Sequence, residues 1–111
     1  SPPRSPTVTD STPTPIGTWR RLRILQWIGY SPDALAAAGG LDRDDITAGL
    51  RGEHLPAATR TQIAALWDVT HMRPELPTPL AKAMHREAIR AGAHSPLAWE
   101  PETIDNAAAR P

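Results

Sequence analysis

Residues 30–52 carry the pattern that most constrains how this 111-residue chain folds. Gly40 lies where a tight turn needs a positive φ, and Asp42 follows as a candidate N-cap for a second helix. Gly52 marks the end of that helix. The pattern therefore predicts two short helices joined by a glycine turn, a helix-turn-helix. The apolar positions of the two helices are Leu35, Leu41, Ile46 and Leu50.

The charges around this motif are unevenly divided. Residues 18–30 contain three arginines and no acidic residue, whereas residues 31–53 contain two arginines against five acidic residues, a net charge of −3. The formal net charge of the whole chain is zero. Zero net charge is uncommon for a free-standing DNA-binding protein, because contacts to phosphates need a basic face.

Composition excludes several classes of protein and site. The chain has no cysteine, so we expect no disulfide, no thiolate nucleophile and no cysteine zinc site. No apolar run approaches the roughly 20 residues that span a bilayer, and the N-terminal residues lack a signal-peptide core. We therefore expect a cytoplasmic protein with no membrane contact.

No pattern of catalytic or metal-binding residues stands out. The spacing of the four histidines matches no metal-binding helix, and the chain has neither a glycine-rich phosphate loop nor a nucleophile elbow. We therefore expect no enzymatic activity, no cofactor and no metal site. The histidines are His54, His71, His85 and His94.

Three segments are expected along the chain. Residues 1–16 are rich in Pro, Ser and Thr and predict a disordered tail. Residues 17–93 predict the helical domain, and residues 94–111 an extended segment. Because Leu97 and Trp99 are strongly apolar, we expect that segment to dock on the domain. The predicted fold class is all-α, a compact bundle of four to five short helices.

The first helix is predicted over residues 18–28, with Thr18 as its N-cap and Leu22, Leu25 and Ile28 facing the core. Ile24 and Trp27 fall on a different face. Two interpretations remain open for them: Trp27 is partly buried against the tail or another helix, or both side chains form an exposed patch that pairs two subunits.

Two further helices are predicted downstream. Residues 56–69 repeat apolar side chains at helical spacing, and a helix over residues 79–91 begins after the N-cap Thr78 and Pro79. The expected buried positions of the former are Thr59, Ile63, Leu66, Trp67 and Thr70. Those of the latter are Leu80, Met84, Ala88 and Ala91.

The segment Gly17–Tyr30 running into the helix-turn-helix, together with Ser95–Glu100 and Thr103–Asp105, resembles small lambda-repressor-like DNA-binding proteins of actinobacteria and their phages. The resemblance covers roughly residues 17–106. It implies a helical bundle that binds double-stranded DNA sequence-specifically through the second helix of the motif, often as a homodimer. The chain departs from the motif at Gly39 and Gly49, where apolar residues are usual. We expect Trp67 or Trp99 to fill that space.

Two functional hypotheses follow. In the first, a DNA-binding transcriptional regulator, one set of residues contacts bases and another contacts phosphates. The base set is Arg43, Asp44, Thr47 and Ala48, and the phosphate set is Arg20, Arg21 and Arg51. In the second, the acidic edge Asp42–Asp45 contacts a basic protein partner, with Ile24 and Trp27 as apolar anchors. The simpler interpretations are that the arginines form a solvated face and that the acids complement the helix dipole.

Overall fold

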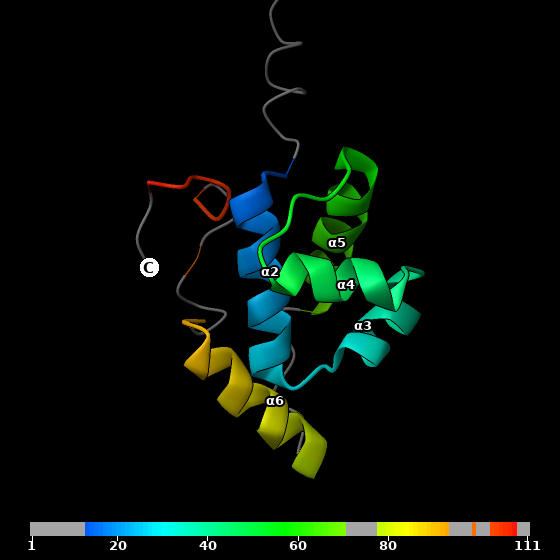
Figure 1. Cartoon of the computed structure of the whole chain (residues 1–111), viewed down its shortest axis with the longest axis vertical. Coiled ribbons are helices and arrows are strands. Elements are labelled where there is room, and N and C mark those ends of the chain that lie inside the picture. The colour runs from blue at the N-terminus through cyan, green and yellow to red at the C-terminus, as the bar shows by residue number, and fades with distance from the viewer. Residues whose placement is uncertain (1–12, 71–77, 94–98, 100–102, 109–111) are drawn as a thin grey trace, which may run out of the picture.

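The computed structural model describes residues 13–70, 78–93, 99 and 103–108, and all structural statements concern these parts of the chain. They form five helices and no strand, which confirms the predicted all-α fold (Figure 1). The predictions for residues 1–12, for Leu97 and for two histidines, His71 and His94, lie outside the described residues. The helices are α2 (Pro15–Ile28), α3 (Pro32–Gly39), α4 (Arg43–Leu50), α5 (Ala57–Thr70) and α6 (Pro79–Arg90).

Helix α2 begins earlier than the sequence analysis placed it. Its N-cap is Thr14, whose side-chain oxygen accepts a hydrogen bond from the Gly17 amide at 3.0 Å. Pro15 suits the first helical position, because the amide that proline lacks has no partner there in any helix. The prediction of Thr18 as the N-cap is therefore wrong, and residues 14–16 belong to α2 and its cap rather than to a tail.

Helix α2 lies at the centre of the molecule and contacts α4, α5 and α6 (Figure 1). Because other helices cover it on several sides, its buried residues extend well beyond one stripe. Ile24 is only 1% exposed, so the predicted Ile24/Trp27 pairing patch is wrong. Trp27 is half-buried, with its ring centroid 4.5 Å from that of His85 on α6. This contact confirms the alternative, in which Trp27 packs against another helix.

The core gathers apolar side chains from every part of the bundle. Helix α5 presents Ile63, Leu66 and Trp67 to it, and these three are buried as predicted. Trp99 and Ile104, which follow α6 in the chain, are also buried in this cluster. The C-terminal part of the chain thus contributes to the core. The cluster comprises Leu22, Ile24, Leu25, Ile28, Leu35, Ile46, Leu50, Leu55, Ile63, Leu66, Trp67, Trp99 and Ile104.

Helix α6 starts as its sequence indicates but packs through a different face. Thr78 accepts a hydrogen bond from the Ala81 amide at 3.0 Å, as expected of an N-cap followed by proline. The buried residues are Ala81 and Ala88, whereas Leu80 and Ala91 are exposed, so the predicted stripe is wrong at its two ends. Small alanine side chains let α6 approach α2 closely, and this contact decides which face is buried.

Gly49 lies where α4 crosses α2. A Cβ atom at this position would lie 2.4 Å from Cδ1 of Leu22 and 3.2 Å from Cδ1 of Leu55. The space next to Gly49 is thus filled by leucines, and the prediction that Trp67 or Trp99 fills it is wrong. The same holds at Gly39, where the nearest atoms belong to two other leucines, Leu41 and Leu66.

We expect Gly49→Ala to destabilise the fold by about 1 kcal/mol. Overpacking a core destabilises the fold by roughly 1–3 kcal/mol, whereas replacing a helical glycine with alanine stabilises the helix by up to about 1 kcal/mol. Urea unfolding followed by tryptophan fluorescence measures the difference. In a Leu22→Val background, which removes the clashing Cδ1, the same substitution should become neutral or stabilising. Stabilisation of the wild-type chain by Gly49→Ala would contradict the close α2–α4 crossing.

Candidate nucleic-acid interface

The helix-turn-helix is built from α3, a three-residue turn and α4, each helix being eight residues long. Ser31 caps α3 by accepting a hydrogen bond from the Ala34 amide. Gly40 then adopts the left-handed conformation, with φ 65° and ψ 34°, which glycine reaches without a steric penalty. Buried Leu35 and Ile46 pack the two helices together. The turn predicted at Gly40 is therefore present.

The outer face of α4 carries most of the residues predicted to contact bases. Arg43 and Asp44 are exposed and Thr47 is half-buried. The Thr47 hydroxyl donates to the carbonyl of Arg43 at 2.9 Å, so its oxygen remains available as an acceptor. Ala48 packs in part against the core, which leaves less of it available to a ligand than of the other three.

The first turn of α4 is acidic. Asp42 occupies the N-cap position with extended backbone angles, but its carboxylate forms no capping hydrogen bond. The predicted position is thus correct and the predicted hydrogen bond is absent. Asp44 and Asp45 follow in the first turn, where their charges complement the helix dipole. With Asp33 nearby on α3, these side chains give the edge of the motif a negative charge.

Both exposed arginines of the motif already have carboxylate partners. Nε of Arg43 lies 2.6 Å from Oδ1 of Asp33, and Nε of Arg51 lies 2.6 Å from Oε2 of Glu53. All four side chains are more than half exposed. Exposed ion pairs contribute roughly 0–1 kcal/mol. A phosphate or a base edge can therefore replace either carboxylate at low energetic cost.

Arg20 was predicted to bind phosphate at the surface, but it is buried. It is 8% exposed, and its Nη1 donates to the carbonyl of Ile104 at 3.0 Å and to that of Asn106 at 2.7 Å. Its guanidinium carbon lies 4.0 Å from the centroid of the Trp99 ring, a cation–π contact. The assignment of Arg20 to phosphate binding is wrong, because the guanidinium holds the C-terminal residues on α2.

Arg21 is equally unavailable to phosphate. It is 7% exposed, and its two terminal nitrogens bind the two carboxylate oxygens of Asp105 at 2.8 and 2.9 Å. Oδ1 of Asp105 also accepts from the Thr14 amide at 2.9 Å. Partial burial raises the pKa of Asp105, but the hydrogen bonds from Arg21 and Thr14 and the charge of Arg21 outweigh it, so the pKa lies below its ordinary value.

We call Trp99 and residues 104–106 the C-terminal clamp. Sequence analysis missed its contacts with Arg20 and Arg21, although one signal was present. Residues 18–30 hold three arginines and no acid, so a counterion for any buried arginine there has to come from elsewhere in the chain. Asp105 supplies it from 84 positions away.

Arg23, the third arginine of α2, connects that helix to the end of α4. Its Nη2 donates to the carbonyl of Leu50 at 2.8 Å, and its Nη1 to the side-chain oxygen of Gln26 at 2.6 Å. Burial lowers the pKa of Arg23, an effect that the charge of Glu87 partly offsets. Arginine still stays charged at neutral pH, because its ordinary pKa lies far above neutrality. Arg23 is half-buried and so remains partly accessible.

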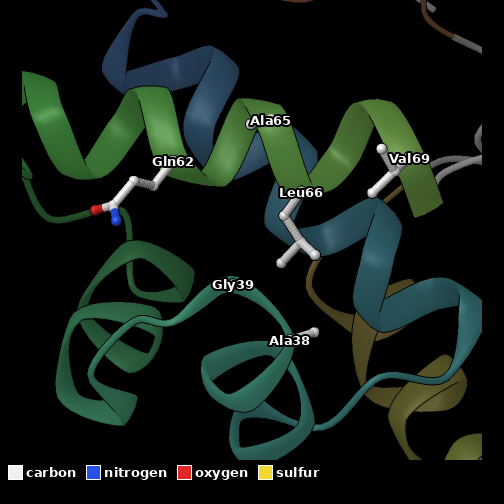
Figure 2. A pocket seen from close by; sticks show the side chains of 6 residues that line it. All are labelled: Ala38, Gly39, Gln62, Ala65, Leu66 and Val69. Atoms are coloured by element: carbon white, nitrogen blue, oxygen red, sulfur yellow. The ribbon is translucent and has the colours of Figure 1, made fainter.

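A shallow hollow of about 280 Å³ lies between the end of α3 and α5 (Figure 2). Val69, which is 66% exposed, stands at one end of it. Among the described lining residues Gln62 alone is strongly polar and none is charged, so the hollow differs in character from the acidic edge of α4. Its lining residues are Ala38, Gly39, Gln62, Ala65, Leu66 and Val69.

The described residues form neither a metal centre nor a membrane-spanning helix. No group of three or more His, Asp or Glu side chains in the described segments is arranged to hold a metal ion. Of the helices described, none has the length and apolar character needed to cross a bilayer. No family model, curated protein or solved structure matches the chain.

Proposed function

We propose that the protein is a helix-turn-helix DNA-binding regulator that contacts base edges through the outer face of α4. The observation that carries this proposal is the geometry of residues 32–50: two eight-residue helices, a three-residue turn with a left-handed glycine, and an uncovered outer face on the second helix. In DNA-binding motifs of this shape, the N-terminal part of the second helix enters the major groove. In α4 that part carries Arg43, Asp44 and Thr47.

The side chains of α4 match base edges in a definite way. Arg43 can donate two hydrogen bonds to O6 and N7 of guanine once it leaves Asp33, Asp44 can accept from N4 of cytosine, and Thr47 can contact either type of base pair. Arg51 can contact a phosphate in place of Glu53. The DNA site that this set favours is therefore rich in G·C pairs at the positions facing Arg43 and Asp44.

Replacing Arg43 with Ala tests this assignment. Duplexes selected from a random pool by the wild-type protein should bind the variant about 5- to 150-fold more weakly, because a bidentate arginine–guanine contact provides roughly 1–3 kcal/mol of discrimination. Affinity for random duplexes should change little. Fluorescence anisotropy measures both affinities, and Asp33→Ala, which frees Arg43, is the control that should preserve the preference. Equal wild-type affinity for selected and random duplexes would contradict the proposal.

A second function, binding of a basic protein partner, is favoured by the acidic edge of the motif. Asp42 makes no capping hydrogen bond, Asp44 is exposed, and Arg43 is already neutralised by Asp33. The negative charges of DNA phosphates would repel these carboxylates, whereas lysine and arginine side chains of a partner would bind them. Ile24 is buried and does not belong to such a surface. Failure of the folded protein to bind any duplex at low salt would favour this second function over the first.

A further inference from the structure

The outer face of α6 carries three basic residues at regular spacing. Lys82, Arg86 and Arg90 follow one another at four-residue spacing, which places successive side chains about 6 Å apart along the helix axis. All three are exposed, whereas Ala81 and Ala88 on the opposite face are buried against the rest of the bundle. We call Lys82, Arg86 and Arg90 the α6 basic stripe. It points away from the core.

No described acidic residue neutralises the stripe. None of its three cations forms an ion pair with a residue in the described segments, in contrast to Arg43 and Arg51 on the helix-turn-helix. The one acidic side chain of α6, Glu87, accepts a hydrogen bond at 2.8 Å from Gln26 on α2 but stays exposed. Within the described segments the stripe is therefore a row of positive charges that form no ion pair, on a chain whose formal net charge is zero.

The surface beside the stripe, at the C-terminal end of α6, contains two arginines and one carboxylate. Arg90 and Arg23 line a hollow of about 290 Å³ together with Glu87 and Ala91, at the C-terminal end of α6. Within the described segments, Nε of Arg23 is buried without a hydrogen-bond partner. The terminal nitrogen of Arg23 binds the last carbonyl of α4, that of Leu50. Arg23 thus contacts both the hollow beside the stripe and the end of α4.

We propose that the α6 basic stripe, extended by Arg23 at this hollow, binds the phosphate backbone of double-stranded DNA. The inference rests on the proposed function and assigns to α6 the phosphate contacts that the burial of Arg20 and Arg21 removes from α2. A backbone of regularly spaced phosphates matches a row of regularly spaced cations, and arginine binds phosphate in a bidentate manner. Such contacts position a duplex without selecting its sequence.

The test compares the stripe variant Lys82→Gln/Arg86→Gln/Arg90→Gln with a charge-preserving control, Arg86→Lys/Arg90→Lys. All substituted side chains are exposed, and circular dichroism checks that each variant is folded. Anisotropy with a short fluorescent duplex is recorded between about 50 and about 200 mM salt, where phosphate contacts dominate the salt dependence. The stripe variant should bind selected and random duplexes about 10-fold or more weakly. Its slope of log affinity against log salt should fall by about 2–3, because each lost phosphate contact removes about 0.9. The control should keep the wild-type slope.

The outcomes separate this inference from the proposed function. If the stripe variant keeps the wild-type salt slope, the proposed role of α6 is wrong. If Arg43→Ala still weakens binding in that case, base contact by α4 remains supported. Stripe-dependent binding with no effect of Arg43→Ala supports the phosphate surface and rejects base contact. Equal stripe-dependent binding to polyglutamate at the same salt overturns the assignment to nucleic acid. Absence of duplex binding by the folded wild-type protein at low salt overturns both.

Discussion

Asp105→Ala is expected to lower the free energy of unfolding by about 3 kcal/mol, because it leaves the guanidinium of Arg21 buried without its counterion. The Asp105 carboxylate accepts hydrogen bonds from both terminal nitrogens of Arg21 and from the amide and hydroxyl of Thr14, so the substitution removes four hydrogen bonds. Breaking a buried ion pair costs roughly 3–5 kcal/mol, and the 26% exposure of the Asp105 side chain favours the lower end of that range. Urea unfolding measures the effect.

The matched control for this prediction is Glu53→Ala, which breaks the exposed pair with Arg51. Both side chains of that pair are more than half exposed, so the cost should stay below about 1 kcal/mol. An Asp105→Ala cost no larger than that of Glu53→Ala would show that the C-terminal clamp does not stabilise the folded chain.

The depressed pKa of Asp105 also sets a pH dependence. A carboxylate whose pKa is lower in the folded state stabilises the fold above its unfolded pKa of about 3.9 and loses that contribution as the pH falls toward the folded value. The stability of the wild-type chain should therefore decline on acidification below about pH 5 more steeply than that of Asp105→Ala. Parallel profiles for the two proteins would contradict the assignment.

Gly17→Ala is expected to lower the free energy of unfolding by about 2–3 kcal/mol, the second large effect. This cost is similar to that of losing the Asp105 contacts. A Cβ atom at residue 17 would lie 1.8 Å from Oδ1 of Asp105 and 3.0 Å from its Cα atom. The overlap is mainly with the carboxylate, which cannot rotate away without losing its hydrogen bonds to Arg21 and Thr14. Either this rotation or a shift of the residues around Asp105 away from α2 separates Asp105 from both partners.

A double-mutant cycle gives this prediction its control. In an Asp105→Gly background the carboxylate is gone, and alanine at residue 17 should cost less than about 1 kcal/mol or stabilise the helix, because alanine is the better helix former. Thermal unfolding of the four proteins yields the coupling energy. An equal cost of Gly17→Ala in both backgrounds would show that the substitution acts within α2 alone.

The features of the fold that sequence predicted correctly depend on neighbouring residues. The turn at Gly40, the start of α6 after Thr78 and the buried face of α5 each arise from a cap, a left-handed glycine or a helical repeat. Such signals act within one or two helical turns of the residue that carries them. The all-α fold could be predicted from them for the same reason.

The features that local sequence patterns did not predict are determined by packing between distant parts of the chain. Ile24 is buried because α2 lies at the centre of the bundle, and the helical repeat of α2 does not reveal how many helices surround it. Arginines on a helix usually indicate a solvated face, yet Arg20 and Arg21 bind acceptors more than 80 positions away. From the sequence one can predict that some arginines bind phosphate. One cannot predict that they lie on α6, because the fold determines which cations remain exposed.

The C-terminal clamp has a consequence for the order of assembly. It joins Thr14 to Asp105, 91 positions apart, whereas the contact between α3 and α4 closes over a few residues. Contacts between distant residues carry the larger loop-closure cost and form after the local ones. During synthesis the helix-turn-helix can therefore form while Arg20 and Arg21 are still open to solvent. When residues 104–106 emerge and bind Arg20 and Arg21, these two charges become buried, so the surface charge of α2 changes during synthesis.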